Sequence, residues 1–413
     1  MTQTQARSAR IAVVGGGIGG LTAALTLLRA GFDVQVYEQA DILSEVGAGI
    51  QLAPNCCRVL HRLALLPAID RVAVRPRAFE FRRWDDNCIL SETPLGEHVE
   101  QSYGMPYYHI HRADLITALA EAVPPDRVQV GRRCVSVEER GGRVRLDFAD
   151  GGTAEADLVV GADGIHSQVR QALLGPELPR FTGNVAYRGL VPAERVAHLG
   201  LEHTITSRLG PRAHFVHYFV SAGRQLNIVC AVEESTWTRE SWTDRGDIAE
   251  LRAAYAGWHP VVGAIIEALD VPLKWALFDR LPLPRWSFGR VTLLGDSCHP
   301  MLPYMAQGAA QAIEDAGALA ACLGVAHPDD LPAALHRYET LRLPRTSVVQ
   351  AMARGNAGRF HLPDGPEQRA RDAAMASSFG LSPEIDWLYG HDAEAIDGAV
   401  SAGGGAPVAP PLP

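Results

Sequence analysis

The chain lacks an excess of positive charge and any long basic run. Its 413 residues carry 38 Lys and Arg against 47 Asp and Glu, a formal net charge of −9. The basic residues are scattered, with no block longer than a pair. Because contacts to a phosphate backbone need clustered Lys and Arg, the composition predicts no nucleic-acid partner. A small anion held by one or two local arginines remains compatible with it.

Cysteine is sparse and badly spaced for any cross-linked framework. The count is odd, no pair has the CxxC spacing, and no other ligand run accompanies them, so neither a disulfide scaffold nor a metal site is expected. We interpret the thiols as reduced side chains of a cytoplasmic protein. They are Cys56, Cys57, Cys88, Cys134, Cys230, Cys298 and Cys322.

A membrane-spanning run is also missing. Arg7 and Arg10 precede an uncharged stretch from Ile11 to Leu28, which superficially resembles a signal peptide or a short membrane helix. Its cluster of glycines suits a buried strand, a glycine loop and a helix better than a membrane helix. No membrane partner is therefore expected.

The length favours two interlocked domains over a single core. Short apolar strands alternate with helices near the N-terminus, which is typical of an α/β fold with a parallel sheet. From about residue 181 the pattern changes to alternating segments such as 213–220 and 225–232, which predict an antiparallel sheet. We therefore expect a Rossmann-like nucleotide-binding domain with an inserted antiparallel β-sheet substrate domain. The boundaries assigned are 1–75, 100–180 and 276–360 for the first, 76–99 and 181–275 for the second, 361–397 for a C-terminal helical segment, and 398–413 for a disordered tail.

The first functional motif is a glycine loop between a strand and a helix. Gly15, Gly17 and Gly20 form a GxGxxG, and Glu38 ends the second predicted strand 23 residues after the first glycine. Such a loop lets backbone approach a pyrophosphate at a helix N-terminus, while the acid binds a ribose hydroxyl. A dinucleotide site is predicted, but this motif does not separate FAD from NAD.

Two further strand ends carry aspartates. The segment 161–170 reads GADGIHSQVR and includes Asp163, and the segment 295–300 reads GDSCHP and includes Asp296. A predicted helix begins at Gly308 soon after the second segment. Each motif taken alone is a common turn; the three in this order are informative.

Together these motifs resemble the single-component FAD aromatic hydroxylases, whose fold is that of 4-hydroxybenzoate hydroxylase and which include salicylate 1-hydroxylase, 3-hydroxybenzoate 6-hydroxylase and 6-hydroxynicotinate 3-monooxygenase. The resemblance covers roughly residues 10 to 390. It implies non-covalent FAD, NADH or NADPH as co-substrate, and O2 activated as a flavin C4a-hydroperoxide that hydroxylates a small aromatic hydroxy acid. It also implies roles for four residues and a helix start. Asp296 would contact the ribityl chain or phosphate, Arg112 the flavin and diphosphate, Asp163 both FAD and the nicotinamide, and the helix start at Gly308 and Ala309 the flavin pyrimidine edge.

The strand 213–220 carries the candidate catalytic residues. With a period of two, His214 and Tyr218 share one face and His217 points the other way. A histidine and a tyrosine at this spacing lie near the substrate in the related 6-hydroxynicotinate enzyme, so we expect His214 to draw a proton from a ring hydroxyl beside Tyr218. The alternative is that both histidines are strand residues satisfied by their neighbours.

Other pocket residues are expected by position. Gln51 and Pro303 depart from the residues found in the 6-hydroxynicotinate and 3-hydroxybenzoate enzymes, which favours a salicylate-like substrate. Pro303 and Tyr304 are predicted to line the pocket. Arg188 is either the partner of a substrate carboxylate or a member of a structural ion pair, and both readings stay open.

Two other functions remain open at this stage. The same FAD motifs serve monooxygenases of larger polycyclic or isoprenoid substrates. A flavoprotein dehydrogenase that does not activate O2 would also carry them. The sequence does not decide whether the protein is a homodimer.

Overall fold

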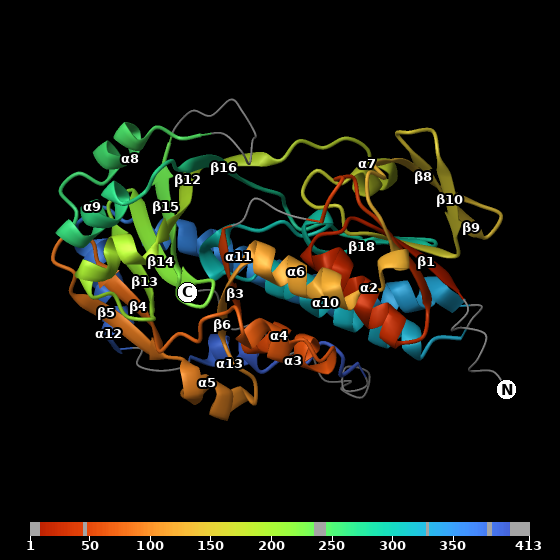
Figure 1. Ribbon diagram of the computed structural model, residues 1–413, viewed down its shortest axis with the longest axis horizontal. Helices are drawn as coiled ribbons and strands as arrows, with labels where there is room; N and C mark the ends of the chain where they lie inside the picture. Colours follow the sequence, from red (N-terminus) through yellow and green to blue (C-terminus); the bar gives the residue numbers. More distant parts are fainter. Residues whose placement is uncertain (1–8, 44–47, 235–244, 328–329, 378–381, 397–413) are drawn as a thin grey trace.

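The computed structural model describes residues 9–43, 48–234, 245–327, 330–377 and 382–396. Two β-sheets lie toward opposite ends of an elongated molecule, with a long helix between them (Figure 1). The tail predicted at 398–413 lies outside the described residues. The architecture agrees with the expected α/β fold with a second, mostly antiparallel sheet.

The first sheet has six strands and surrounds the glycine loop. Strand β1 (Arg10–Val14) lies inside it and pairs in parallel with its two neighbours, as a βαβ unit requires. The strand order is β17-β18-β11-β1-β2-β7, with β2 at Asp33–Tyr37, β7 at Val128–Gln129, β11 at Leu158–Gly161, β17 at Ser287–Phe288 and β18 at Val291–Leu293. The inner strands are apolar because they are buried on both faces.

Helices α2 (Ile18–Arg29), α6 (Arg112–Ala122) and α10 (Gly308–Gly324) pack side by side against this sheet (Figure 1). Helix α2 begins at Ile18, within the glycine motif. Gly17, in extended conformation, is its N-cap, so the last glycines of the loop already belong to the helix. The helix N-terminus is thereby brought directly to the end of β1.

Two glycines of the loop are required by close packing. Gly15 has φ +108, and a Cβ there would lie 2.4 Å from the carbonyl oxygen of Ala162. A Cβ on Gly20 would lie 1.9 Å from the carbonyl oxygen of Gly15. Both distances are far below van der Waals contact, so neither position accepts a side chain without a backbone shift.

The second sheet has seven strands and is antiparallel except where β13 pairs with β4. The order is β16-β12-β15-β14-β13-β4-β5, with β4 at Ala78–Arg83, β5 at Ile89–Pro94, β12 at Arg180–Pro192, β13 at Ile205–Gly210, β14 at Ala213–Val220, β15 at Gln225–Glu233 and β16 at Leu273–Asp279. Strand β16 runs past the predicted boundary at 275, because its pairing with β12 continues to Asp279.

One face of this sheet is covered and the other is turned toward the nucleotide-binding side. Helices α8 (Ile248–Ala254) and α9 (Pro260–Glu267) supply apolar side chains to the covered face, where Phe215 and Ile228 are fully buried. The alternate residues of the same strands face inward. The sheet therefore separates a structural core from a cavity wall.

The remaining elements are small. Strands β8 (Cys134–Arg140), β9 (Arg143–Phe148) and β10 (Thr153–Ala156) form a three-stranded sheet, and β3 (Gly49–Leu52) pairs with β6 (Tyr108–His111). The other helices are α3 (Pro54–Arg62), α4 (Leu66–Asp70), α5 (Gly96–Tyr103), α7 (Gln168–Leu174), α11 (Leu331–Phe360), α12 (Pro366–Ser377) and α13 (Pro383–Tyr389); the 3-10 turns are η1 (Pro125–Arg127), η2 (Ala193–Leu199), η3 (Gly295–Ser297) and η4 (Pro303–Met305).

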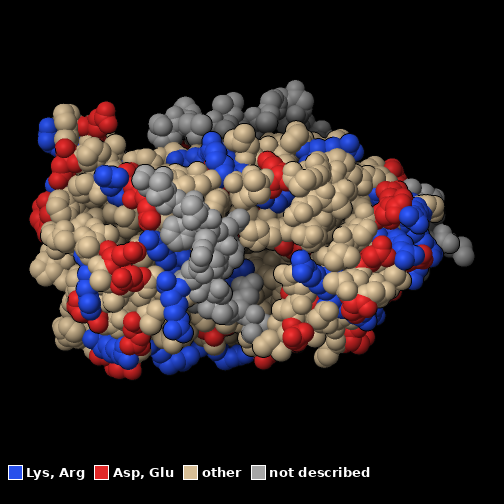
Figure 2. Space-filling view, turned by 90° about the horizontal axis from the view of Figure 1, so that it is seen from above, with Lys and Arg blue, Asp and Glu red and all other residues tan. Residues whose placement is uncertain are grey.

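All seven cysteines are free, and six of them are buried. Acidic and basic side chains are interspersed over the face shown in Figure 2. None of the described helices combines the length and the apolar character needed to cross a bilayer.

Substitution of Gly20 tests the close packing of the glycine loop. Gly20→Ala should lower the free energy of unfolding by about 1–3 kcal/mol, the usual cost of overpacking, and reduce flavin retention. Gly358→Ala is the matched control, since this position in α11 has open space around it and gains about 0.5–1 kcal/mol of helix preference. Urea unfolding of both variants measures the difference, and equal stabilities would contradict this packing.

Candidate active site

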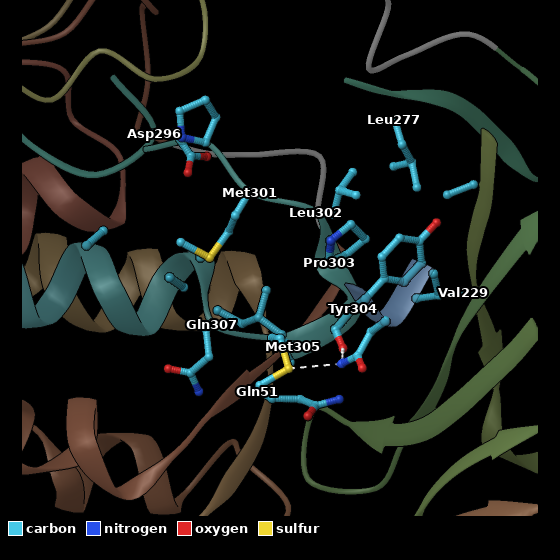
Figure 3. Close-up of a pocket in the computed structure, with 18 of the residues that line it drawn as sticks. Gln51, Val229, Leu277, Asp296, Met301, Leu302, Pro303, Tyr304, Met305 and Gln307 are labelled. Atoms are coloured by element: carbon cyan, nitrogen blue, oxygen red, sulfur yellow. Dashed lines mark hydrogen bonds between the residues drawn. The ribbon is translucent and has the colours of Figure 1, made fainter. Parts of the chain in front are cut away.

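One large cavity connects the two sheets. Its volume is about 1570 Å³, and its walls include the glycine loop, the start of α10 and the inner face of the seven-stranded sheet. Pockets for single small ligands usually have volumes of about 300–1,000 Å³. This cavity is therefore large enough to hold a dinucleotide and a small substrate together. Figure 3 shows the part of it where the loop 301–307 meets the sheet.

The glycine loop and Glu38 line one end of the cavity. The Glu38 carboxylate accepts hydrogen bonds from the backbone N–H groups of Gly16 (2.6 Å) and Ala40 (2.8 Å), which fix it at the end of β2. Each carboxylate oxygen has a second lone pair, so both can still accept from ribose hydroxyls. Gly15 and Gly17 line the same end, as predicted for a pyrophosphate site.

Asp163 also lines the cavity, but its carboxylate already accepts hydrogen bonds from within the protein. It accepts hydrogen bonds from the hydroxyl of Ser167 (2.5 Å) and from the N–H groups of Gln168 (2.7 Å) and Val169 (3.2 Å) at the start of α7. Burial raises its pKa, and these donors oppose that shift. The carboxylate therefore caps a helix, and its contact with FAD and the nicotinamide stays a prediction.

Asp296 and Arg112 form an oppositely charged pair across the cavity. The Asp296 side chain opens into the cavity but lies deep in the protein, so burial raises its pKa, while His299 and Arg112 lower it (Figure 3). Burial likewise lowers the pKa of Arg112, and Asp296 raises it. Both residues line the cavity, so a bound polar ligand can contact them.

The N-terminus of α10 faces the same region. Its N-cap, Gln307, makes no side-chain capping bond, so the first N–H groups at Gly308 and Ala309 remain available to a ligand. A Cβ on Gly308 would lie 4.0 Å from Oδ1 of Asp296, which places this helix start beside that carboxylate. The positive end of a helix dipole stabilises negative charge, as an anionic reduced flavin requires. These residues fit FAD, which supplies the redox and oxygen chemistry when bound.

The inner face of β14 lines the opposite end. His214, Val216 and Tyr218 border the cavity, whereas His217 points away and is 2.9 Å from Nη1 of Arg208. The alternation expected from a period of two is therefore present. His214 and Tyr218 are brought together on one wall.

The imidazole of His214 is buried and faces further aromatic rings. Its Nδ1 lies 2.7 Å from Nε2 of His361, and the ring of Tyr304 is 5.1 Å away between centroids. Burial, followed by the neighbouring His361, lowers the pKa of His214 well below its ordinary value of 6.5. The side chain is thus a neutral imidazole at neutral pH.

Tyr218 belongs to a second hydrogen-bonded group with Gln51. The hydroxyl of Tyr107 donates to Oε1 of Gln51 (2.6 Å), and Gln51 also bonds to Tyr218. Burial raises the pKa of Tyr218 to about 12, with Arg188 and Gln51 opposing the shift. The phenol is neutral and can donate a hydrogen bond. Both Gln51 and Tyr218 line the cavity.

Arg188 projects from β12 into the same wall. Its Nη2 donates to the carbonyl oxygen of Gly49 (3.1 Å), and its guanidinium lies 5.0 Å from the ring centroid of Trp275. No carboxylate of the described residues forms an ion pair with it, so the structural ion pair left open above is not found. Burial lowers the pKa of Arg188. A deeply placed cation without an acidic partner favours an anionic ligand.

Pro303 and Tyr304 lie in η4 at the junction of the two walls, as expected (Figure 3). The Tyr304 hydroxyl is buried and has no hydrogen-bond partner within the described part of the chain. Burial raises its pKa. It is therefore a donor that a bound ligand can satisfy.

The sequence did not indicate several residues that contribute to the wall. His361 contacts His214 from 147 positions away, and Ser207 adds a buried hydroxyl without a partner among the described residues. Met352 and Met375 come from helices α11 and α12, which carry no recognised motif. Their places depend on how distant elements pack, which no local pattern encodes.

A family model described as an FAD binding domain matches residues 8–353. The chain belongs to this FAD-binding family. It is 47% identical over 396 residues to a 3-amino-4-hydroxybenzoate 2-monooxygenase of Streptomyces platensis, with 96% of this chain and 99% of that protein covered. It is 42% identical over 356 residues to a 6-hydroxynicotinate 3-monooxygenase of Pseudomonas fluorescens, covering 85% and 91%.

Among solved structures, the fold is similar to a salicylate hydroxylase substrate complex, with a TM-score of 0.80, 29% identity, and 94% and 97% of the two chains covered. The resemblance inferred from the three motifs is thereby confirmed. The protein is an FAD-dependent aromatic monooxygenase.

Removal of the Asp296 carboxylate tests the flavin end of the cavity. Asp296→Ala should lose FAD on dialysis while retaining the far-ultraviolet circular dichroism of the parent, because the side chain lines the cavity and does not belong to an apolar core. Flavin absorbance per protein measures occupancy, with the exposed Asp126→Ala as control. Full occupancy in the Asp296 variant would remove this residue from the site.

Proposed function

We propose that this enzyme hydroxylates a small aromatic acid whose ring hydroxyl lies opposite the carboxylate, using O2 and NADH or NADPH. One oxygen atom of O2 enters the ring, the other leaves as water, and the nicotinamide supplies the hydride. We also propose a cytoplasmic location, which the seven free cysteines support.

The observation that carries the substrate proposal is the arrangement of polar groups along β14. His214 and Tyr218 are four residues apart on one face, a separation of about 13 Å along the strand. Between them the floor is apolar, formed by Val216 and its cross-strand partner Val229. A flat ring over that floor would place one polar substituent toward each end.

The two ends differ in charge. Arg188 lies in the same cross-strand row as Val229, and its charge lowers the pKa of Tyr218, so the cation is nearer the tyrosine end. The His214 end carries a neutral imidazole. We therefore assign the substrate carboxylate to Arg188 and Tyr218, and the ring hydroxyl to His214.

The relatives support this orientation. In both 3-amino-4-hydroxybenzoate and 6-hydroxynicotinate, the hydroxyl and the carboxylate lie on opposite ring atoms, and these names belong to relatives at 47% and 42% identity. Salicylate carries the two groups on adjacent atoms, and a salicylate hydroxylase of Pseudomonas putida is 35% identical to this chain. We therefore favour the opposed arrangement over the salicylate-like one expected from Gln51 and Pro303.

The chain's own residues would act by position and proton transfer. Nε2 of His214 accepts the proton of the ring hydroxyl, which makes the ring more electron-rich for attack by an electrophilic oxygen. Arg188 and Tyr218 orient the carboxylate, and Tyr304 excludes water beside the ring. Arg112, Asp296 and the α10 N-terminus hold the flavin close to it.

A larger substrate is the second candidate, because the cavity has a volume of about 1570 Å³ and is also lined by Met352 and Met375 of helices α11 and α12. A panel of acids separates the candidates. NADH and NADPH oxidation and product formation would be measured with 4-hydroxybenzoate, 3-amino-4-hydroxybenzoate, 6-hydroxynicotinate, salicylate and 3-hydroxybenzoate, with 4-hydroxybenzamide as the uncharged control. We expect kcat/KM to be at least about tenfold higher for the first three acids than for the other compounds. The amide lacks the negative charge that would pair with Arg188, and this lowers its kcat/KM. Preference for salicylate or the amide would overturn the assignment.

Substitution of the two β14 histidines tests the base. His214→Ala should lower the hydroxylation rate at neutral pH by about a hundredfold or more, and His217→Ala should not. Because the pKa of His214 is depressed in the folded enzyme, the base stays unprotonated as pH falls through 6.5, and the wild-type rate should stay level there. The His214 variant should recover as pH rises toward the pKa of the phenol, when solvent supplies the phenolate. A greater loss in the His217 variant would contradict the face assignment.

A further inference from the structure

Behind His214, next to the residues that line the cavity, lies a second imidazole, that of His361. This residue ends helix α11, and its side chain is 2% exposed. Its Nε2 lies 2.7 Å from Nδ1 of His214, and its Nδ1 lies 3.6 Å from Oε1 of Glu233. Glu233 ends β15, is 37% exposed, and accepts a hydrogen bond from Nε of Arg212 (3.1 Å). The three side chains thus form a line from the cavity to the surface.

Hydrogen-bond chemistry restricts the protonation of this line. Two neutral imidazoles that share one N···N hydrogen bond need one donor and one acceptor. If His361 donated from Nε2, its Nδ1 lone pair would face the Glu233 carboxylate, and two electron-rich atoms would oppose each other. The opposite tautomer places a proton on Nδ1 of His361, toward the carboxylate. At 3.6 Å the contact between Nδ1 and the carboxylate is longer than a hydrogen bond. The negative charge still attracts a proton on Nδ1 and repels a lone pair there, so it favours this tautomer.

Among the groups that contact the His361 ring, Glu233 is the charged one, so it determines which nitrogen of His361 carries the proton. Its other titratable contacts are His214 from β14 and Tyr304 from η4, whose ring is 6.2 Å away. Tyr304 is neutral, because burial raises its pKa. Burial lowers the pKa of His361 to about 4, so it too is neutral at rest. Arg212 touches the far oxygen of Glu233 and is 71% exposed, which limits its influence.

We propose that His361 and Glu233 are positioning residues that hold His214 in the tautomer whose Nε2 lone pair faces the cavity. With Nε2 of His361 acting as acceptor, Nδ1 of His214 must be the donor. The remaining lone pair of His214 then lies on Nε2, which has no protein partner within the described residues. This inference rests on the proposed function of His214 as the base.

The same arrangement handles the proton after it leaves the substrate. The ring O–H bond breaks and an N–H bond forms at Nε2 of His214. The Nδ1 proton of His214 then shifts to Nε2 of His361, while the Nδ1 proton of His361 passes to the Glu233 carboxylate, which releases it to solvent. These steps are proton transfers, with no oxidation or reduction. Both buried histidines are then neutral, and the proton taken from the substrate has been replaced by one released at the partly exposed Glu233.

Three variants of the holoenzyme test this assignment, with 3-amino-4-hydroxybenzoate as the probe substrate. His361→Phe keeps a ring of similar shape but has no acceptor. His361→Gln retains an acceptor oxygen near the position of Nε2. Glu233→Gln removes the charge, and Glu234→Gln is its matched control, since the neighbouring Glu234 pairs instead with Lys274 at 3.1 Å. Product per NAD(P)H oxidised, flavin reduction rate, FAD occupancy and the pH profile from 6 to 9 would be measured for each.

We expect His361→Phe to lower hydroxylation at pH 7 by about a hundredfold, as loss of the base itself does, with flavin reduction unchanged and recovery at high pH. His361→Gln should restore at least about a tenth of the wild-type rate, and Glu233→Gln should lose only about two- to fivefold, because its contact with His361 is long and partly exposed. Glu234→Gln should behave as wild type.

Two outcomes would overturn the assignment. One is a loss in His361→Phe that is equal at all pH values, accompanies slower flavin reduction and is not relieved in His361→Gln, since a purely structural residue behaves in this way. The other is normal hydroxylation in both His361 variants while His214→Ala remains inactive. A harmless His214→Ala would instead show that the proposed base is wrong. The two failures are therefore distinguishable.

Discussion

A buried carboxylate, that of Asp315, connects the elements on which the cavity depends. It accepts hydrogen bonds from Nε of Arg342 (2.7 Å) and the N–H of Gly295 (3.0 Å), and lies 2.6 Å from Nε2 of His299. The carboxylate therefore joins α10, α11 and the 295–300 loop at one point. The loop carries Asp296 and leads to Pro303, and α10 directs its N-terminus toward the flavin position. Asp315 therefore helps to fix the loop and the helix start, both of which line the cavity.

The neighbouring Glu314 extends this point into an ionic cluster. It bonds to Arg342 and to Nη2 of Arg345 (2.9 Å), and both acids are fully buried. The charges of the two arginines and of His299 hold the pKa values of the acids below their usual range despite the burial. Such clusters add little net stability, but removal of one partner leaves a buried charge and costs about 3–5 kcal/mol. The main effect of the cluster is therefore on structural specificity: it selects the one packing of α10 against α11 in which every buried charge has a partner.

The parts of this architecture that could be predicted from the sequence are those encoded locally. Gly15 and Gly20 stand out because their spacing serves one backbone geometry, and the shared face of His214 and Tyr218 follows from strand periodicity. The contact of His214 with His361 could not be predicted, because it joins a strand to the end of a 30-residue helix far along the chain. That helix contains Pro344, which indicates a break when read alone. Ionic contacts of Arg342 and Arg345 on either side of it retain the helix.

The charges that line the cavity also bear on which substrate would bind and in which orientation. Arg112 has Asp296 as an electrostatic partner, whereas Arg188 has no acid among the described residues. A carboxylate substrate at the proposed position would supply a negative charge in a region where burial disfavours the guanidinium. Binding of that anion lowers the cost of keeping Arg188 charged, and its attraction is strong because little water remains to screen it. Once the carboxylate is fixed at this end, the ring can reach His214 only with its opposite substituent. The same cation would thereby favour the charged substrate and set the register of the ring against the base.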